Sequence, residues 1–267
     1  MRGFELFVVL LLLACFAPAQ DWAKKRLESS PRHQEWVDVQ HGSRTVKCFV
    51  VFPEVKEKAP VVVVIHEIMG LTDWVMSVAD RLAEAGYIAI APDLLSGMAP
   101  NGGRTPDFAG SGAAREAISA LPPDQVTADL NAASDYGLKL PACNGKLAVG
   151  GFCWGGAQTF RFATNRADLS AAYVFYGTGP TDEAAIGRIK SPVYGFYGSN
   201  DNRVNSTIPA SEEAMKRAGK TYEPVLYEGA GHGFMRSSEA PDASDANRKG
   251  FEDGWSRWKA LLSRLRG

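Results

Sequence analysis

The chain has 267 residues, of which 45% are hydrophobic and 22% are charged, and 29 basic against 30 acidic residues give a net charge of −1. This composition is typical of a globular protein and excludes disordered, collagen-like and disulfide-scaffold chains. The near-neutral charge gives no indication of a nucleic-acid partner or of an anionic membrane surface as a binding site. We therefore expect a compact, monomeric protein that handles a small molecule.

The first 19 residues have the pattern of an export signal. Arg2 precedes an apolar run over residues 6–17, and Ala17-Pro18-Ala19 supplies the small residues that a signal peptidase reads. The run is shorter than the roughly 20 residues that a membrane-spanning helix needs. We predict a signal peptide over 1–19 and a domain over 20–267, exported to the periplasm or secreted, with no membrane segment after signal removal.

The cysteines leave two questions open. Leu12-Leu13-Ala14-Cys15 resembles a lipobox, so lipoprotein anchoring at Cys15 is the alternative to simple cleavage. Removal of the signal leaves Cys48, Cys143 and Cys153, and an odd number keeps at least one thiol free even in an oxidising compartment. The sequence does not decide whether Cys48 and Cys143 pair, and two unpaired thiols are the favoured interpretation.

Strands and helices are expected to alternate along the mature chain. A β-hairpin is expected at 36–52, strands at 61–65, 87–91, 146–149, 173–176, 193–197 and 222–227, helices at 74–85, 123–138 and 251–265, and a loop-rich stretch at 94–121. Such alternation predicts an α/β fold with a mostly parallel sheet and helices on both faces. No Ser/Gly/Pro linker divides the chain, so we expect a single domain.

A cysteine in a glycine-rich turn follows the strand expected at 146–149. In Gly151-Phe152-Cys153-Trp154-Gly155-Gly156, glycine stands two positions to each side of Cys153. A nucleophile on a strand-to-helix turn has a strained backbone, which requires small neighbours. The helix N-terminus favours a thiolate. We interpret Cys153 as a nucleophile, with an inert thiol in a glycine-rich turn as the alternative.

Asp201 and His232 follow later expected strands, in the chain order nucleophile, acid, histidine. The imidazole would take or hold the proton of the nucleophile, and the carboxylate would fix the imidazole tautomer and stabilise its cation. Chemistry in parallel sheets gathers beyond the carboxyl ends of the strands. We therefore expect Cys153, Asp201 and His232 to meet as a catalytic triad.

The chain resembles the dienelactone hydrolases, a branch of the α/β-hydrolase fold with a Cys-His-Asp triad. The matching motifs run in family order over about residues 45 to 265: His66-Glu67-Ile68-Met69-Gly70-Leu71, Ala91-Pro92-Asp93-Leu94, Gly151-Phe152-Cys153-Trp154-Gly155-Gly156, Gly198-Ser199-Asn200-Asp201 and Gly231-His232-Gly233-Phe234. The cysteine turn together with the Glu67 segment is specific for this family. The resemblance implies an α/β-hydrolase fold and the hydrolysis of a lactone or ester.

The resemblance also implies roles for residues beside the triad. A glutamate at the position of Glu67 pairs with the resting thiol and accepts its proton as substrate arrives. The backbone N–H groups of Ile68 and Trp154 would form the oxyanion hole, one residue after Glu67 and after Cys153.

Family members hold the substrate carboxylate with two arginines. Arg236 fits one of them, and Arg115 is a looser match for the other, with Arg104 as its competitor. The stretch 97–121 does not match the family closely, and we expect it to line the pocket.

Three functions follow as hypotheses. The first is an exported lactone or carboxylic ester hydrolase with an acyl-cysteine intermediate. The second is an exported esterase of the same fold that acts on unrelated esters, and the third is a binding module without turnover. No zinc spacing, Walker loop or Rossmann fingerprint occurs, so we expect no cofactor and no metal.

Overall fold

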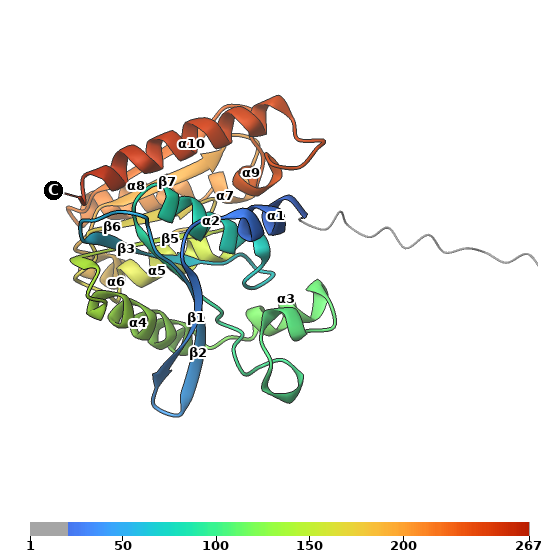
Figure 1. The fold of residues 1–267 in the computed structure, drawn as a ribbon. Coiled ribbons are helices and arrows are strands. Elements are labelled where there is room, and N and C mark those ends of the chain that lie inside the picture. Colours follow the sequence, from blue (N-terminus) through green and yellow to red (C-terminus); the bar gives the residue numbers. More distant parts are fainter. Residues whose placement is uncertain (1–20, 267) are drawn as a thin grey trace, which may run out of the picture.

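The computed structural model of the chain describes residues 21–266, so the predicted signal peptide and the lipobox at Cys15 lie outside the described residues. Eight strands form one sheet in the order β1-β2-β4-β3-β5-β6-β7-β8, with helices on both faces (Figure 1). The strands are β1 (Gln34–His41), β2 (Arg44–Val51), β3 (Ala59–Ile65), β4 (Ile88–Pro92), β5 (Cys143–Phe152), β6 (Ala171–Phe175), β7 (Val193–Gly198) and β8 (Tyr222–Tyr227). From β4 to β8 all neighbouring strands are parallel, while β2 pairs antiparallel with β1 and with β4.

The helices divide between two core clusters, one on each face of the sheet. The α-helices are α1 (Asp21–Ser29), α2 (Asp73–Glu84), α3 (Ser111–Ser119), α4 (Pro123–Lys139), α5 (Trp154–Ala163), α6 (Glu183–Arg188), α7 (Asn202–Asn205), α8 (Ile208–Arg217), α9 (Phe234–Ser237) and α10 (Asp245–Ser263). Helices α1, α2, α9 and α10 pack on one face, and α3 to α8 pack on the other. Strand β3 serves both clusters: Val61, Val63 and Ile65 face one core and Val62 and Val64 face the other. This two-sided burial explains the unbroken β-branched run in the sequence.

The predicted α/β fold with a mostly parallel sheet is confirmed, as are the opening hairpin and the six later strands. Several helices were not anticipated. Among them are α1 and α3, of which α3 lies inside the stretch at 94–121 that was expected to be loop-rich. Within residues 21–266 the three cysteines are free, with Cys48 and Cys143 both buried. The same residues contain no helix that is long and apolar enough to cross a bilayer.

Hydrogen bonds at the end of β4 fix the path of the irregular stretch that follows. The buried Asp93 carboxylate accepts from the backbone N–H of Thr105 at 3.0 Å and from its hydroxyl at 2.7 Å. The Thr105 hydroxyl oxygen in turn accepts from the backbone N–H of Leu71 at 3.0 Å. These bonds tie the segment that leads into α3 to the segment that follows β3.

We expect Thr105→Val to lower the free energy of unfolding by about 1–3 kcal/mol, because Leu71 N–H loses its acceptor and Asp93 loses a donor while side-chain shape is kept. Urea denaturation of both proteins measures the difference. Thr221→Val is the matched control, since this exposed threonine has no side-chain hydrogen bond within residues 21–266. If Thr105→Val lowers the free energy of unfolding no more than Thr221→Val does, the hydrogen bonds of Thr105 do not contribute to stability.

Candidate active site

Cys153 occupies the turn between β5 and α5 with a backbone conformation that few residues adopt, φ 55° and ψ −115°. The two glycines around it are needed for close packing. A Cβ on Gly151 would collide with the backbone oxygen of Gly155, and one on Gly155 would collide with the backbone oxygen of His66. The strained strand-to-helix turn expected from the sequence is therefore present, and it presents the thiol above the sheet edge.

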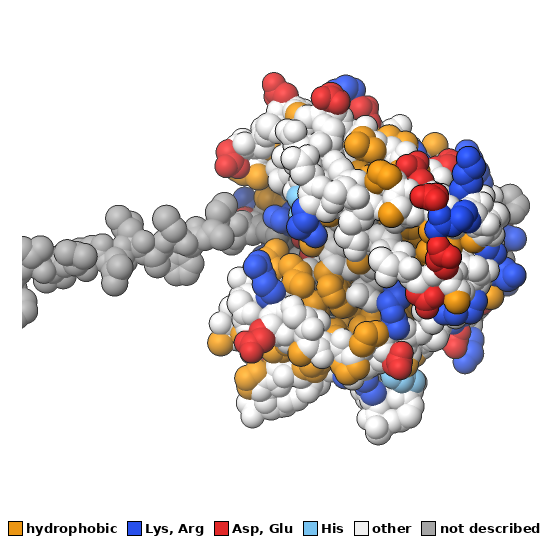
Figure 2. All heavy atoms as spheres, turned by 180° about the vertical axis from the view of Figure 1, so that it is seen from behind, with side chains coloured by type: hydrophobic (Ala, Val, Ile, Leu, Met, Phe, Trp, Pro, Cys, Tyr) orange, Lys and Arg blue, Asp and Glu red, His pale blue; other side chains and the backbone are white. Residues whose placement is uncertain are grey.

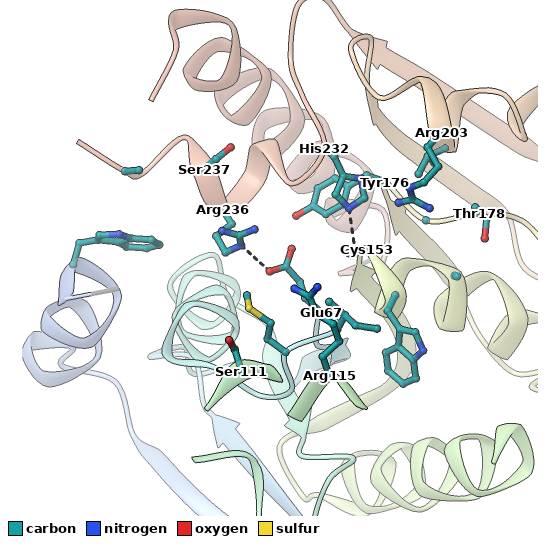
Figure 3. Close-up of a pocket in the computed structure, with 18 of the residues that line it drawn as sticks. Glu67, Ser111, Arg115, Cys153, Tyr176, Thr178, Arg203, His232, Arg236 and Ser237 are labelled. Atoms are coloured by element: carbon teal, nitrogen blue, oxygen red, sulfur yellow. Dashed lines mark hydrogen bonds and ion pairs between the residues drawn. The ribbon is translucent and has the colours of Figure 1, made fainter. Parts of the chain in front are cut away.

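His232 links Cys153 to Asp201. Its Nε2 lies 3.1 Å from the Cys153 Sγ (Figure 3), and its Nδ1 lies 2.5 Å from an Asp201 carboxylate oxygen. Asp201 is buried, and its other oxygen accepts from the backbone N–H of Val204 at 3.4 Å, which orients the carboxylate. The hydrogen bond to the Cys153 sulfur and the contact with Asp201 raise the pKa of His232 against the opposing effect of burial. The three residues predicted as a triad meet in one chain of contacts.

Glu67 lies beside the thiol, but its partner is Arg236 rather than Cys153. The Glu67 carboxylate accepts from the Arg236 Nε at 2.7 Å (Figure 3). Burial raises the pKa of Glu67, and the Arg236 guanidinium opposes that shift. The resemblance implied a resting pair between Glu67 and the thiol, and this arrangement differs because a buried carboxylate is stabilised most by the cation within its reach.

The two backbone N–H groups expected to form the oxyanion hole follow Glu67 and Cys153. Within the described part of the chain, no backbone carbonyl accepts from Ile68 N–H or from Trp154 N–H, which is the first residue of α5. The buried His66 ring positions this region. Its Nδ1 donates to the Glu67 carbonyl at 2.8 Å, its Nε2 accepts from Leu94 N–H at 3.3 Å, and burial lowers its pKa. The Trp154 indole stacks on that ring at 5.7 Å.

A pocket of about 1220 Å³ opens over these groups. It lies on the face drawn in Figure 2, where hydrophobic side chains gather in a hollow with Lys and Arg side chains around it. Its lining comes from helices on both sides of the sheet: Asp21, Trp22, Lys25, Glu67, Ile68, Met69, Ser111, Arg115, Cys153, Trp154, Ala157, Tyr176, Gly177, Thr178, Arg203, Val204, His232, Arg236, Ser237, Ala240 and Pro241.

Both arginines proposed for carboxylate binding line the pocket, Arg236 from α9 and Arg115 from α3. The competitor Arg104 points elsewhere. Its guanidinium lies 3.9 Å from the centre of the Trp36 ring and 3.8 Å from an Asp93 oxygen. The expectation that residues 97–121 contribute to the pocket holds through Ser111 and Arg115.

Several pocket residues were missed from the sequence. Tyr176 follows β6 directly, has φ 40°, and stands with its ring edge toward His232 at 5.1 Å. Its buried hydroxyl has no hydrogen-bond partner within residues 21–266. The sequence could have indicated Tyr176 as a site residue, because it lies at the end of an expected strand. It could likewise have indicated Arg203, which lies two residues after Asp201. Trp22 and Lys25 of α1 gave no such signal, since they precede the first strand.

Comparisons with known proteins agree with this geometry. The model of the dienelactone hydrolase family matches residues 46–265. A protein of Escherichia coli K12 named "Putative carboxymethylenebutenolidase" is 33% identical over 211 residues, which are 74% of each chain. A dienelactone hydrolase-like promiscuous phosphotriesterase from metagenomic libraries has 26% identity and a TM-score of 0.74, over 88% of this chain and 99% of that one. A dienelactone hydrolase of Anabaena variabilis, at 18% identity and a TM-score of 0.65 over 87% and 98%, shares the fold.

The cysteine turn, the Glu67 segment and the strand order thus agree with a match that extends over most of the chain. This chain belongs to the dienelactone hydrolase family, within the α/β-hydrolase superfamily.

Proposed function

We propose that this family member is an exported hydrolase that cleaves a lactone or carboxylic ester through an acyl-cysteine intermediate. Family membership supports a dienelactone hydrolase-like hydrolase. The observation that carries the mechanism is the continuous contact from Asp201 through His232 to the Cys153 sulfur. Export rests on the pattern of residues 1–19 alone.

The reaction follows from these positions. The Cys153 sulfur attacks the carbonyl carbon after Glu67 has taken the thiol proton and while His232 is protonated, and the carbonyl oxygen becomes an oxyanion beside Ile68 N–H and Trp154 N–H. The carbon–oxygen bond to the alcohol breaks, and His232 gives the alcohol its proton. Water then attacks the thioester as His232 takes its proton, and the acid leaves as the sulfur regains a proton. For a lactone, both products remain one molecule.

Glu67 and Arg236 would couple substrate binding to this step. A substrate carboxylate that binds the Arg236 guanidinium competes with Glu67 for the same cation. Release of Glu67 from its 2.7 Å contact would leave a buried carboxylate whose pKa burial has raised. Such a carboxylate is a stronger base and can accept the Cys153 proton. In the free enzyme its negative charge disfavours the thiolate, which would slow oxidation of an exported thiol.

Cys153→Ala is expected to lower hydrolysis of p-nitrophenyl acetate by 10³-fold or more, because the proposed acyl intermediate forms on the Cys153 sulfur. Steady-state rates and the burst of p-nitrophenol measure the loss. Cys143→Ala is the matched control, a buried cysteine outside the pocket, and its folded fraction should keep its activity. Retention of more than a few per cent of activity by the Cys153 variant would identify another nucleophile, and a wild type without turnover would favour a binding module.

His232→Ala should change how Cys153 reacts with iodoacetamide as pH varies. The pKa of His232 is raised by its hydrogen bond to the sulfur, so the imidazolium persists to higher pH, and its positive charge favours the thiolate over the thiol, opposite to the effect of Glu67. Without it, we expect alkylation at pH 7 to be about tenfold slower. Alkylation rates between pH 5 and 10 test this, and identical profiles would refute the coupling.

Glu67→Gln should accelerate alkylation of the free thiol by iodoacetamide yet lower ester turnover, each by about tenfold, a free-energy change of about 1.4 kcal/mol. The substitution removes a negative charge beside the sulfur and leaves the positive charge of Arg236 without an opposite charge, and both changes favour the thiolate. It also removes the proton acceptor. Glu228→Gln, an exposed carboxylate outside the pocket, is the control. If either rate stays unchanged, Glu67 has only a structural role.

A further inference from the structure

Helix α1 closes one end of the active-site pocket. Asp21, Trp22 and Lys25 line the pocket there, together with Ala240 and Pro241 from the segment after α9. In Figure 3, α1 stands across the pocket from Cys153, while Arg203 and Thr178 lie at the opposite end. The helix begins two residues after the predicted cleavage at Ala19, so it would remain in the mature enzyme.

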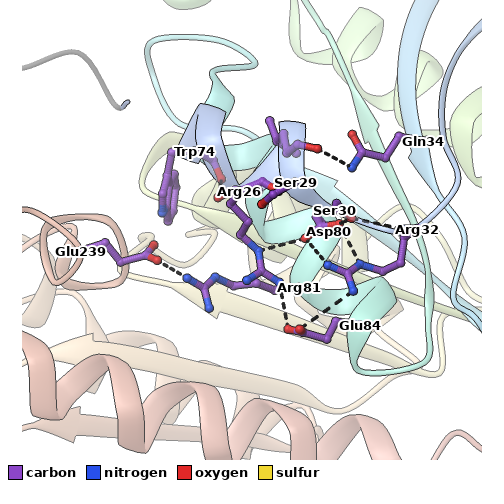
Figure 4. Close-up of polar contacts among 12 residues, drawn as sticks. Arg26, Ser29, Ser30, Arg32, Gln34, Trp74, Asp80, Arg81, Glu84 and Glu239 are labelled. Atoms are coloured by element: carbon purple, nitrogen blue, oxygen red, sulfur yellow. Dashed lines mark hydrogen bonds and ion pairs between the residues drawn. The ribbon is translucent and has the colours of Figure 1, made fainter. Parts of the chain in front are cut away.

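A buried carboxylate holds this wall on the protein. Asp80 of α2 is fully buried, and Arg26 of α1 approaches one of its oxygens at 2.9 Å (Figure 4). Arg32, in the segment after α1, reaches both oxygens at 2.8 Å, and the Ser30 hydroxyl donates to one of them. A buried charge with this many partners is costly to expose, so α1 is anchored.

The facing segment is anchored on the same helix. Arg81, the residue after Asp80, donates to the Glu239 carboxylate, directly before Ala240 (Figure 4). Ala23 is fully buried in the core that α2 shares, which directs the opposite side of α1 to the pocket. Both walls of this end of the pocket therefore depend on α2 for their position.

This end of the pocket is partly apolar. Trp22, Ala240 and Pro241 provide apolar surface, while Asp21 and Lys25 place two charged side chains beside it. The volume of about 1220 Å³ exceeds the roughly 300–1,000 Å³ of ordinary small-ligand pockets. The leaving alcohol lies beside His232 to receive its proton, and α1 stands across the pocket from Cys153 (Figure 3), so an acyl group on the Cys153 sulfur that extends toward α1 reaches this apolar surface.

We propose that Trp22, with Ala240 and Pro241, forms a subsite for the acyl group, and that the substrates are esters whose acyl chain is long and apolar or ends in an aromatic ring. This inference rests on the proposed ester hydrolysis. Helix α1 then contributes to substrate selectivity and takes no part in the catalytic steps.

Alkylation of Cys153 tests the subsite without turnover. The measured quantity is the rate of Cys153 alkylation by N-(3-phenylpropyl)iodoacetamide divided by the rate with iodoacetamide. The same ratio for glutathione, a thiol without a pocket, is the reference. We expect the ratio for the enzyme to exceed the ratio for glutathione. Trp22→Ala, which removes the aromatic wall, and Ala240→Phe, which fills the space, should each lower it about tenfold. Trp36→Ala is the matched control, a partly exposed tryptophan outside the pocket that should leave the ratio unchanged.

Circular dichroism confirms that each variant is folded, and Ala240→Phe decides the result if Trp22→Ala does not fold. Hydrolysis of p-nitrophenyl acetate and p-nitrophenyl 4-phenylbutyrate is measured alongside, with the same loss expected in relative kcat/KM for the longer ester. Equal ratios in wild type and both variants would overturn the subsite even if both esters are hydrolysed. A lowered ratio in an enzyme that hydrolyses neither ester would support the subsite and refute the proposed function.

Discussion

The site depends on the left-handed backbone of Cys153, which allows a strand to end and a helix to begin at one residue. That turn requires glycine at positions 151 and 155, because a Cβ at either position would collide with a backbone oxygen. The close approach brings the start of α5 against the end of β3, where His66, Glu67 and Ile68 follow. Thiol, oxyanion donors and Glu67 are therefore placed by a single packing contact between backbones.

Two buried carboxylates serve this thiol, and their neighbours give them different roles. Asp201 is held by Val204 N–H and by His232, so it orients the imidazole that contacts the sulfur. Glu67 is buried against a cation, and burial raises its pKa while Arg236 opposes the rise. Because Arg236 also faces the pocket, any anion that binds there acts on Glu67 through a shared partner. In the proposed reaction, this ion pair is the point at which the charge of the substrate influences Cys153.

The candidate catalytic groups and the pocket walls come from different parts of the fold. Cys153, Asp201 and His232 follow β5, β7 and β8, beyond the last register pairs of those strands. The walls come from α1, α3 and the segment after α9, which are attached by polar clusters around Asp80, Asp93 and Glu239. Such attachments let walls differ between relatives while the chemistry stays in place.

The sequence alone determined the alternation of strands and helices and the strained glycine-flanked turn at Cys153, and it predicted that Asp201 and His232 meet this cysteine. These are local patterns, in which a few neighbouring residues fix the backbone, and the parallel sheet brings strand ends together. Only the tertiary structure decided that Glu67 pairs with Arg236, 169 positions away, and that Arg115 rather than Arg104 lines the pocket. The first outcome is itself a long-range ion pair, and the second depends on where Thr105 anchors the segment that leads into α3. Long-range hydrogen bonds to buried carboxylates set those positions, and they leave no periodic signal in the chain.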